Sequence, residues 1–332
     1  MRVLCTGGAG YVGSACLRWL LAHGHEAFAY DNLSAGNRAA VPETEQRLVV
    51  GDLTDSASLS ATLDQLEIEA VMHFAALASV PESVAAPESY WRTNVVGTKN
   101  LLDAMRACRV AKLIFSSTAA TYAFTDRMPL TEASEQNPAT PYGTTKLACE
   151  AMIRDYHNAY GLQYTIMRYF NASGADPDGE YGEDRKNESH LIPLVLYVPM
   201  GRREKVRVYG DDWDTRDRTC VRDYVHNDDI ALAHQLALDA LKPGVGRTYN
   251  IGTDRGVTVL EVVRACEKVL GAKIPVEFAP RRPGDPAILV ASCDKVKAEL
   301  GWRPRYDTIE AIVETAYAWH RKYPNGYADK RA

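Results

Sequence analysis

Thr6-Gly7-Gly8-Ala9-Gly10-Tyr11-Val12-Gly13 is the stretch of sequence that decides the fold. The residues before it, Arg2–Thr6, form a short apolar run that is typical of a buried strand. Residues 14–23, which follow it, carry the apolar spacing of a helix, and Gly24 is a residue type that ends helices. A second strand, Glu26–Asp31, finishes in an acid 18 residues beyond Gly13. The sequence therefore predicts a strand, a glycine turn, a helix and a second strand in succession.

This arrangement indicates that the chain binds a dinucleotide. Glycine lets backbone amides approach a pyrophosphate, and the amino-terminal end of a helix favours its negative charge. Asp31 can accept hydrogen bonds from the adenosine ribose, and its carboxylate would repel the 2′-phosphate of NADP. Asn32-Leu33-Ser34 supplies no arginine to neutralise that phosphate. A glycine triplet alone is often just a tight turn, but the strand, helix and acid in register predict NAD as the cofactor.

The composition is ordinary for a globular α/β protein. The chain has 332 residues, enough to bury a full core, with 46% apolar and 24% charged residues. Its net charge of −5 argues against general affinity for nucleic acid or acidic membranes, although a local basic pocket remains compatible with it. The first strand begins directly after Met1, and no apolar run approaches membrane-spanning length, so we expect neither a secretory signal nor a membrane partner.

The cysteines and histidines bear on the cellular compartment and on metal binding. The seven cysteines are scattered, and none forms a Cys-x-x-Cys pair, which indicates reduced thiols in a cytoplasmic protein. The eight histidines show no metal-ligand spacing, so we assign no metal.

The first half of the chain alternates between apolar strands and amphipathic helices. Such alternation predicts an α/β fold built on a doubly wound parallel sheet of the Rossmann type. The further strands expected here are 47–52, 70–76, 112–117 and 164–170, and the helices are 56–66, 90–108 and 144–160. Ligands bind at the carboxyl ends of the strands in such sheets, so the polar residue at the end of each strand is a candidate for ligand binding.

The character of the sequence changes after Asn171. A polar, turn-rich stretch, 175–187, is typical of a long functional loop. Beyond it we predict short strands at 206–209, 248–251 and 275–278 and helices at 227–240, 259–270 and 307–322. We interpret residues 1–172 as an NAD-binding domain. Residues 173–332 would form a smaller α/β lobe that mainly binds the substrate, with some segments returning to the first domain.

Tyr142-Gly-Thr-Thr-Lys146 is the second strong signal. On a helix, residues four apart lie on one face, so the lysine ammonium can stabilise a phenolate. Together with the positive charge of an oxidised nicotinamide, it can lower the pKa of the phenol towards the range of a general base. A chance Tyr and Lys on a solvated helix is common, but here the pair follows a dinucleotide turn and the strand end Ser116-Ser117-Thr118.

These motifs resemble the extended short-chain dehydrogenase/reductase superfamily, and within it the family of UDP-glucose (UDP-galactose) 4-epimerases along nearly the whole chain. The matching runs include His73-Phe-Ala-Ala76, Arg168-Tyr-Phe-Asn171, His190-Leu-Ile-Pro193, Val221-Arg-Asp-Tyr-Val-His226 and Arg282-Pro-Gly-Asp285. The resemblance implies an isomerase of nucleotide-sugar and galactose metabolism.

The resemblance also implies roles for individual residues. Tyr142 would take the proton from the 4-hydroxyl of the sugar, Lys146 would hold the nicotinamide ribose and tune Tyr142, and Thr118 would bond the same hydroxyl. The cofactor contacts would come from Gly7, Gly10, Tyr11, Val12, Gly13, Asp31, Asn32, Asp52, Leu53, Phe74, Ala75, Ala76, Asn94, Ser116, Tyr142, Lys146 and Tyr169. The UDP-sugar contacts would come from Thr118, Tyr142, Asn171, His190, Leu191, Arg207, Tyr209, Arg222, Arg282 and Asp285.

The expected reaction is epimerisation of a UDP-hexose at C4. By resemblance, hydride would leave C4 of the sugar for NAD. The 4-keto sugar would then rotate within the site, and hydride would return to the opposite face of the sugar. Leu289 falls near the position that limits pocket size for 2-acetamido sugars in this family, and its bulk favours plain hexoses. Tyr122-Ala123 replaces a more usual Tyr-Gly beside the site.

Several alternatives stay open at this stage. A related 4,6-dehydratase would need an acid and a base after the threonine, whereas Thr118 is followed by Ala119-Ala120. An epimerase or decarboxylase acting on a UDP-N-acetylhexosamine, UDP-pentose or UDP-uronate shares the core motifs, although a carboxylate substrate would call for an extra cation. A non-catalytic NAD-binding regulator would be expected to have lost the Tyr-Lys pair or the nucleotide site.

The resemblance further suggests a homodimer built on a four-helix bundle of 90–108 and 146–160. The apolar positions on these helices fit either a subunit interface or the core of one subunit. They are Leu101, Leu102, Met105, Met152 and Ile153.

Overall fold

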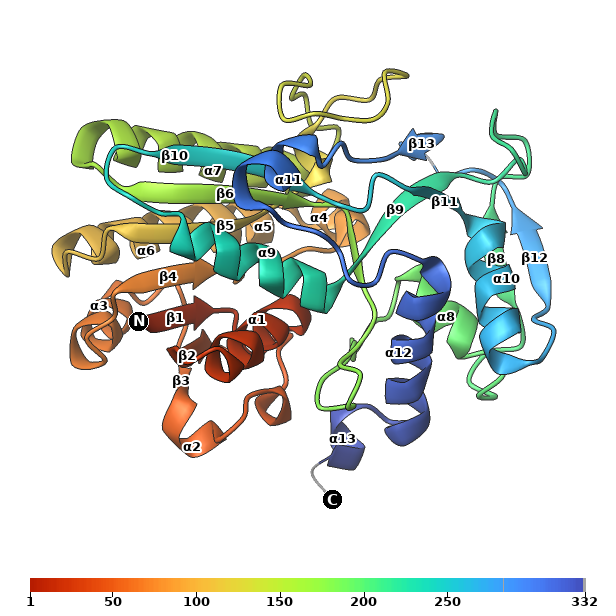
Figure 1. Ribbon diagram of the computed structural model, residues 1–332, viewed down its shortest axis with the longest axis horizontal. Helices are drawn as coiled ribbons and strands as arrows, with labels where there is room; N and C mark the ends of the chain where they lie inside the picture. The colour runs from red at the N-terminus through yellow and green to blue at the C-terminus, as the bar shows by residue number, and fades with distance from the viewer. Residues whose placement is uncertain (283, 331–332) are drawn as a thin grey trace.

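A parallel sheet of seven strands forms the centre of the molecule (Figure 1). The computed structural model describes residues 1–282 and 284–330. The strand order is β10-β6-β5-β4-β1-β2-β3, and every neighbouring pair is parallel. The bounds are β1 Arg2–Thr6, β2 Glu26–Asp31, β3 Leu48–Val50, β4 Ala70–His73, β5 Lys112–Thr118, β6 Gln163–Tyr169 and β10 Gly246–Ile251. The predicted doubly wound α/β fold is confirmed.

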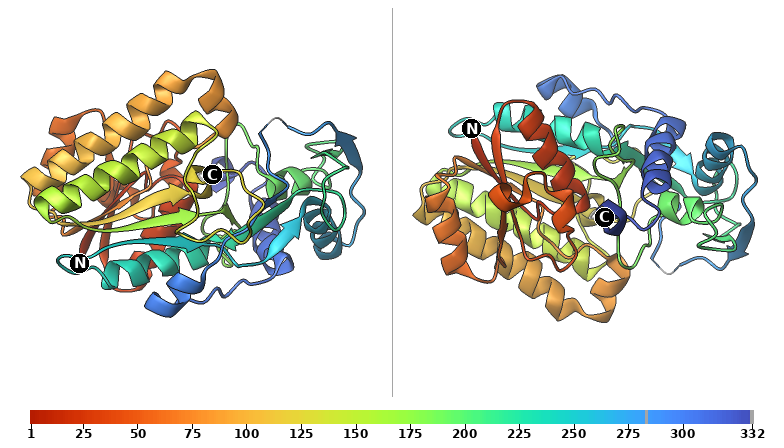
Figure 2. Two further views of the ribbon diagram at one scale, coloured as in Figure 1. Left: turned by 90° about the horizontal axis from the view of Figure 1, so that it is seen from above. Right: turned by 90° about the horizontal axis from the view of Figure 1, so that it is seen from below.

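Helices cover both faces of this sheet because successive strand residues point to opposite sides. In β1, Val3 and Cys5 join one apolar core, while Leu4 joins the other. Views from above and below show the helices layered on either side (Figure 2). The first face packs against α1 Tyr11–Ala22, α9 Asn227–Asp239 and α11 Asp294–Leu300, and the second against α3 Ser56–Gln65, α6 Gly97–Ala107 and α7 Pro141–Tyr160.

The second half of the chain contributes to the sheet as well as to the smaller lobe. Strand β10 pairs with β6 from Gly246↔Tyr164 to Ile251↔Tyr169. Helix α9 packs directly on α1, as the shared core of Leu17, Ile230 and Ala233 indicates. The division of the chain into two domains at residue 172 stays a prediction. The segments β10 and α9 come after residue 172 in the chain but pack with the seven-stranded sheet.

The remaining elements form the smaller lobe beside the carboxyl ends of the strands (Figure 1). A separate core, including Ile192, Val208, Val262 and Val313, holds it together. Its helices are α8 Leu191–Leu196, α10 Val259–Leu270, α12 Ile309–Lys322 and α13 Tyr327–Lys330. Its strands are β7 Asn171–Ser173, β8 Val206–Tyr209, β9 Val221–His226, β11 Gly256–Thr258, β12 Val276–Ala279 and β13 Ile288–Leu289, where β9 pairs with β7, β11 and β13 and β8 pairs with β12.

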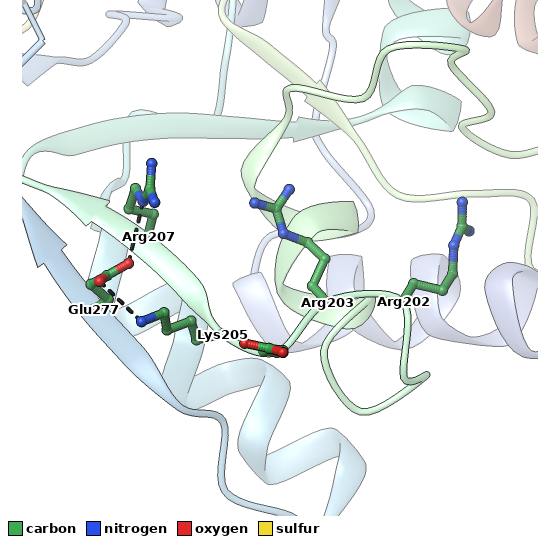
Figure 3. A pocket seen from close by; sticks show the side chains of 6 residues that line it. Arg202, Arg203, Lys205, Arg207 and Glu277 are labelled. Carbon is green, nitrogen blue, oxygen red and sulfur yellow. Dashed lines mark hydrogen bonds and ion pairs between the residues drawn. The ribbon is translucent and has the colours of Figure 1, made fainter.

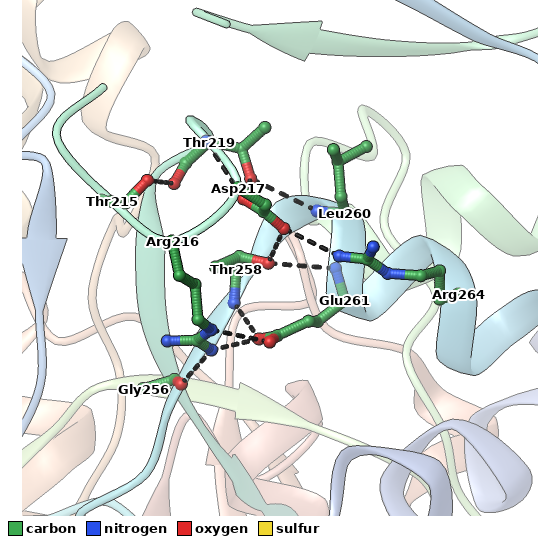
Figure 4. A network of polar contacts seen from close by, with 9 residues as sticks. All are labelled: Thr215, Arg216, Asp217, Thr219, Gly256, Thr258, Leu260, Glu261 and Arg264. Atoms are coloured by element: carbon green, nitrogen blue, oxygen red, sulfur yellow. Dashed lines mark hydrogen bonds and ion pairs between the residues drawn. The ribbon is translucent and has the colours of Figure 1, made fainter. Parts of the chain in front are cut away.

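A polar network fixes the loop before β9 to the start of α10 (Figure 4). Thr258 and Glu261 cap the helix reciprocally, and Arg216 pairs with Glu261. Asp217 accepts hydrogen bonds from Thr258 Oγ1 at 2.5 Å and from Arg264 at 2.8 Å. The network therefore anchors the loop that leads into β9, the strand that carries Arg222.

Some predicted boundaries differ from those observed. Helix α7 begins at Pro141 and not at residue 144, because Thr140 caps it and proline is compatible with the first helical turn. Strand β3 is shorter than 47–52, since the preceding α2, Thr44–Arg47, takes its first residue. The helix predicted for 90–108 contains the π-helical segment Trp91–Val96. The other short elements are Arg38–Ala40, α4 Val80–Ala85, α5 Pro87–Tyr90 and Ala119–Thr121.

Every helix among the described residues is too short or too polar to cross a bilayer.

Candidate active site

The glycine turn lies against the end of β4, where only glycine fits. Gly7 has a φ of +72°, and a Cβ there would stand 2.5 Å from the Ala75 amide nitrogen. A Cβ on Gly13 would stand 2.2 Å from the Gly7 carbonyl oxygen. Helix α1 begins at Tyr11 with Gly10 as its cap, which offers no side chain to the first-turn amides. The turn is thus a tight backbone cradle at a helix amino terminus, which fits a pyrophosphate.

Asp31 closes β2 beside this cradle. Its carboxylate accepts hydrogen bonds from the Ala9 amide at 3.0 Å and the Leu33 amide at 2.8 Å. Burial raises the pKa of the carboxyl group. Close by, Asn32 Nδ2 donates to Asp52 Oδ2 at 2.7 Å. The structure therefore brings Asp31, Asn32 and Asp52 together at the edge where an adenosine ribose was predicted.

Tyr142, Lys146 and Thr118 meet where β5 ends against the first turns of α7. Lys146 is buried, its Nζ donates to the Ser116 carbonyl at 2.7 Å, and it lies 4.7 Å from the centre of the Phe115 ring. The Thr118 hydroxyl lies close enough to the Tyr142 phenol to lower the pKa of that phenol. The ring of Tyr90 packs edge-on against Tyr142 at 6.4 Å.

The pKa values of this group follow from burial. Burial raises the pKa of Tyr142 to about 12, and the Thr118 hydroxyl and the Arg185 guanidinium oppose that rise. Burial lowers the pKa of Lys146 to about 8, and the Glu150 carboxylate partly offsets the effect. In the protein alone the phenol is thus a proton-bearing group, and further positive charge is needed to make it a base.

Ser116 and Asn94 make hydrogen bonds next to the group of Tyr142, Lys146 and Thr118. The Tyr169 hydroxyl donates to Ser116 Oγ, next to the carbonyl that holds Lys146. The Asn94 side chain accepts from the Leu77 amide at 2.8 Å and donates to the Leu77 carbonyl and to Thr145 Oγ1 at 3.1 Å. Its amide is therefore used in tying the segment after β4 to α7.

The polar loop 175–187 also reaches the site. Glu183 is buried, with a pKa lowered to about 2, because it pairs with Arg185 at 2.8 Å and with His190 at 2.5 Å. Arg185 is close enough to lower the pKa of Tyr142 and that of Tyr11. Sequence reasoning missed Arg185 and Glu183 individually, although the composition of the loop had marked it as functional.

Ligand atoms of Glu183, Glu188 and His190 lie within 4.8 Å of one another. Because the guanidinium of Arg185 already pairs with Glu183, we assign no metal to this cluster.

Four of the predicted nucleotide-binding residues lie together in the smaller lobe. Arg222 and Arg282 both pair with Asp285, at 3.4 and 2.9 Å. The Arg282 guanidinium lies 4.8 Å from the centre of the Tyr209 ring. Two arginines, an acid and an aromatic ring at one place are suited to a nucleoside diphosphate. Asn171 joins from β7 and donates to the Asp223 carbonyl at 2.8 Å.

Arg207, on β8 two residues before Tyr209, is paired with an acid of the neighbouring strand β12. It pairs with Glu277 at 3.3 Å, and Lys205 pairs with the same carboxylate at 3.0 Å. In Figure 3 dashed lines join Arg207 and Lys205 to Glu277, whereas Arg202 and Arg203 extend away from it. The side chain of Arg207 is thus engaged in an exposed basic hollow.

The other predicted residues lie in or next to the elements described above. Tyr11 donates to the Gly174 carbonyl at 2.5 Å, Phe74 packs on His234, and Leu53 is buried beneath Gly97. Val12 follows Tyr11 in the first turn of α1, Ala75 and Ala76 follow β4, and Leu191 opens α8 after His190.

Comparisons with known proteins give consistent results. Residues 4–315 match the family model described as GDP-mannose 4,6 dehydratase. The UDP-glucose 4-epimerase of Corynebacterium glutamicum is 50% identical over 96% of this chain and 95% of its own length. That of Halalkalibacterium halodurans is 46% identical over 99% of this chain and 98% of its own length. The crystal structure of UDP-glucose 4-epimerase from Bifidobacterium longum in complex with NAD+ and UDP is 38% identical, covers 98% of this chain and 100% of its own, and has a TM-score of 0.93.

Proposed function

The chain belongs to the UDP-glucose 4-epimerase family and to the family described by the GDP-mannose 4,6 dehydratase model, and we propose that it interconverts UDP-galactose and UDP-glucose with NAD as its cofactor. The observation that carries this proposal is the grouping of Tyr142, Lys146 and Thr118 at the end of β5, beside a glycine cradle and a nucleotide cluster. This is an arrangement for moving a proton at a sugar hydroxyl.

The residues present fit NAD. The cradle at Gly7 and Gly13 has no room for side chains, which suits backbone contact with a pyrophosphate. Asp31 would accept from the adenosine ribose, and Lys146 would hold the nicotinamide ribose. When bound, NAD supplies a hydride acceptor for C4 of the sugar and the donor that returns the hydride.

The side chains of this chain would perform the proton chemistry. Tyr142 would take the proton from the C4 hydroxyl and give it back, while Thr118 would hold that oxygen by a hydrogen bond. Lys146 would keep a positive charge within one helical turn of the phenol. Because the pKa of Tyr142 is about 12 in the protein alone, the charge of the oxidised cofactor would complete its activation.

Epimerisation requires that both faces of the keto sugar meet the same hydride. The nucleotide must therefore be held firmly and the hexose loosely. We propose that Arg222 and Arg282 hold the diphosphate and that Asp285 and Tyr209 complete the uridine end, at the convergence described above. Asn171, His190 and Leu191 would also contact the UDP-sugar.

Two rival reactions are less well supported. Dehydration needs an acid and a base beside Thr118, but the short helix that follows it begins with Ala119 and Ala120, which carry only methyl groups. A uronate substrate would need a cation near the sugar. Arg185 is such a cation, but the buried carboxylate of Glu183 balances its charge.

The test is incubation of the purified protein with UDP-galactose, with and without added NAD, followed by chromatographic separation of the UDP-hexoses. Formation of UDP-glucose supports the proposal. Failure to convert UDP-galactose while NAD binds would contradict it and favour another nucleotide sugar. Parallel incubations with UDP-N-acetylgalactosamine, a UDP-pentose and a UDP-uronate would then identify the substrate.

We further propose a cytoplasmic homodimer. Four of the five predicted positions, Leu101, Leu102, Met105 and Ile153, are buried in the core of one subunit, so core packing explains them, whereas Met152 is half-buried against the same core. Other apolar side chains on the same helices and on α4 are exposed: Val84, Trp91, Val96 and Tyr160. Sedimentation that gives only a monomer at all concentrations would contradict the dimer. The seven free cysteines support a reducing compartment.

A further inference from the structure

A buried polar network begins on α7, one turn beyond Lys146. The Glu150 carboxylate accepts from Ser117 Oγ at 2.7 Å and from Arg168 of β6 at 2.6 and 2.8 Å. Glu150 is 0% exposed and Arg168 1% exposed. Because Ser117 directly precedes Thr118, this carboxylate joins the two elements that carry the groups proposed for catalysis.

The network continues through Tyr122 to Asn250 on β10, the strand next to β6, where Asn250 is paired in register with Arg168. Arg168 Nη1 donates to the Tyr122 hydroxyl at 2.9 Å, and that hydroxyl donates to Asn250 Oδ1 at 2.6 Å. Asn250 Nδ2 then donates to the Leu130 carbonyl at 2.9 Å. Tyr122 is therefore the side-chain link between the buried ion pair and Asn250, while Glu132 of the same loop between β5 and α7 adds a weaker contact to Arg168 at 3.4 Å and accepts from the Asn250 amide at 2.8 Å.

Leu130 in turn holds the segment that follows β13. Its amide donates to the Val290 carbonyl at 2.8 Å, and the Ser292 amide donates to its carbonyl at 2.7 Å. Leu289 packs on Ala119, Tyr122 and Leu130, beside the turn that Thr118 starts. The same residue pairs in register with Arg222 of β9. One short segment thus contacts both the sugar end and the nucleotide end of the candidate site.

We propose that Tyr122 is a positioning residue that sets the width of the sugar pocket, because its hydroxyl fixes β13 and Leu289 relative to the catalytic helix. The proposal rests on the proposed function. Buried hydrogen-bonded networks keep one arrangement because each member left without a partner costs free energy. Without the Tyr122 hydroxyl, Asn250 loses its donor and its hold on Leu130 weakens. Glu150, Ser117 and Arg168 keep their mutual bonds, so the catalytic end stays in place.

The test uses Tyr122→Phe, which retains the ring that packs on Leu289. The quantity measured is the ratio of kcat/KM for UDP-N-acetylgalactosamine to kcat/KM for UDP-galactose. We expect this ratio to rise about three- to tenfold, the range set by the loss of one buried hydrogen bond. Hydrogen exchange should accelerate in the peptide that spans residues 288–292.

Tyr156→Phe is the matched control. Tyr156 lies on α7, the helix that carries Glu150, and like Tyr122 it donates one hydrogen bond, to Asp103 at 2.6 Å, but this partner lies on α6, away from β13. This variant should change neither the ratio nor the exchange of residues 288–292. A double-mutant cycle completes the design: Leu289→Ala should raise the ratio directly, and Tyr122→Phe should add little in that background.

An unchanged ratio and unchanged exchange in folded Tyr122→Phe overturn the proposal, as does an equal shift in Tyr156→Phe. If the wild-type protein converts neither sugar, the proposed function fails. Hydrogen exchange at residues 288–292 then decides the positioning role without reference to activity.

Discussion

Lys146 Nζ donates a 2.7 Å hydrogen bond to the carbonyl oxygen of Ser116. This bond holds the ammonium against the end of β5, one helical turn from the phenol of Tyr142. Burial raises the pKa of that phenol to about 12, so the ammonium alone does not make Tyr142 a base at neutral pH. The positive charge of an oxidised cofactor is the further contribution that the site requires.

Adding NAD to the cofactor-free protein should therefore lower the pKa of Tyr142. A positive charge near a phenol stabilises the phenolate, so the shift is downward. The measurement is the tyrosinate absorbance as a function of pH, taken as the difference between the wild type and Tyr142→Phe. A Tyr142 pKa that is the same with and without NAD would show that Tyr142 does not face the nicotinamide.

Tyr142→Phe should reduce turnover of UDP-galactose by about 10²–10⁴-fold, because it removes the group that moves the proton. NAD and UDP affinities should change little. Tyr90→Phe is the control, since it keeps the ring that packs edge-on against Tyr142 and loses only a hydrogen bond to the Ser79 carbonyl. Turnover retained in Tyr142→Phe would be incompatible with the proposed mechanism.

Gly13→Ala should abolish NAD retention. The added Cβ would lie 2.2 Å from the Gly7 carbonyl oxygen, so the cradle has to open. Gly10→Ala provides a graded comparison, because its Cβ would meet the same oxygen at 3.2 Å. Cofactor content after purification and NAD titration measure both variants. Equal NAD binding by the two would mean that the cradle does not hold the cofactor.

Glu150→Gln should lower the free energy of unfolding by about 3–5 kcal/mol, since it leaves the charge of Arg168 buried without its counter-ion. Arg154→Gln removes another partner of the same carboxylate, but the Arg154 side chain is 36% exposed, and the expected cost is about 0–1 kcal/mol. Reversible urea unfolding compares them. Similar losses in the two variants would contradict a special role for the buried pair.

The pairing of Glu183 with His190 should make stability depend on pH. Glu183 raises the pKa of His190, so this contribution is fully present below the unfolded pKa of histidine, about 6.5, and is lost as pH rises through the raised value. Glu183 itself has a pKa of about 2, so its contribution is present above the unfolded value of about 4.5 and fades as pH falls towards 2.

The difference in melting temperature between the wild type and Glu183→Gln should therefore be largest between about pH 4.5 and about pH 6.5. Above that range it should shrink to the part supplied by Arg185. In His190→Asn the alkaline decline should disappear. A difference that stays constant from about pH 5 to about pH 9 would rule out the pairing as the source.

The sequence by itself determined the local features of this protein. The turn at Gly7–Gly13, the alternation of strands and helices, and the four-residue spacing of Tyr142 and Lys146 depend on neighbouring residues, whose backbone preferences and periodicity are readable directly. Apolar runs bounded by polar strand ends likewise placed Asp31 and Thr118 at one edge of a parallel sheet.

Tertiary structure decided the features that join distant segments. Glu150 and Arg168 are 18 residues apart and Tyr122 and Asn250 are 128 apart, and each pair meets only because β5, β6 and β10 are neighbours in the sheet. Arg185 reaches the site from a loop with no periodic pattern. Leu101 and Ile153 are core residues because α6 and α7 pack their apolar faces on the sheet, whereas the apolar spacing alone fits a core and an interface equally. The order of the strands and the packing of helices and loops against them are the physical reasons, and no local pattern encodes either.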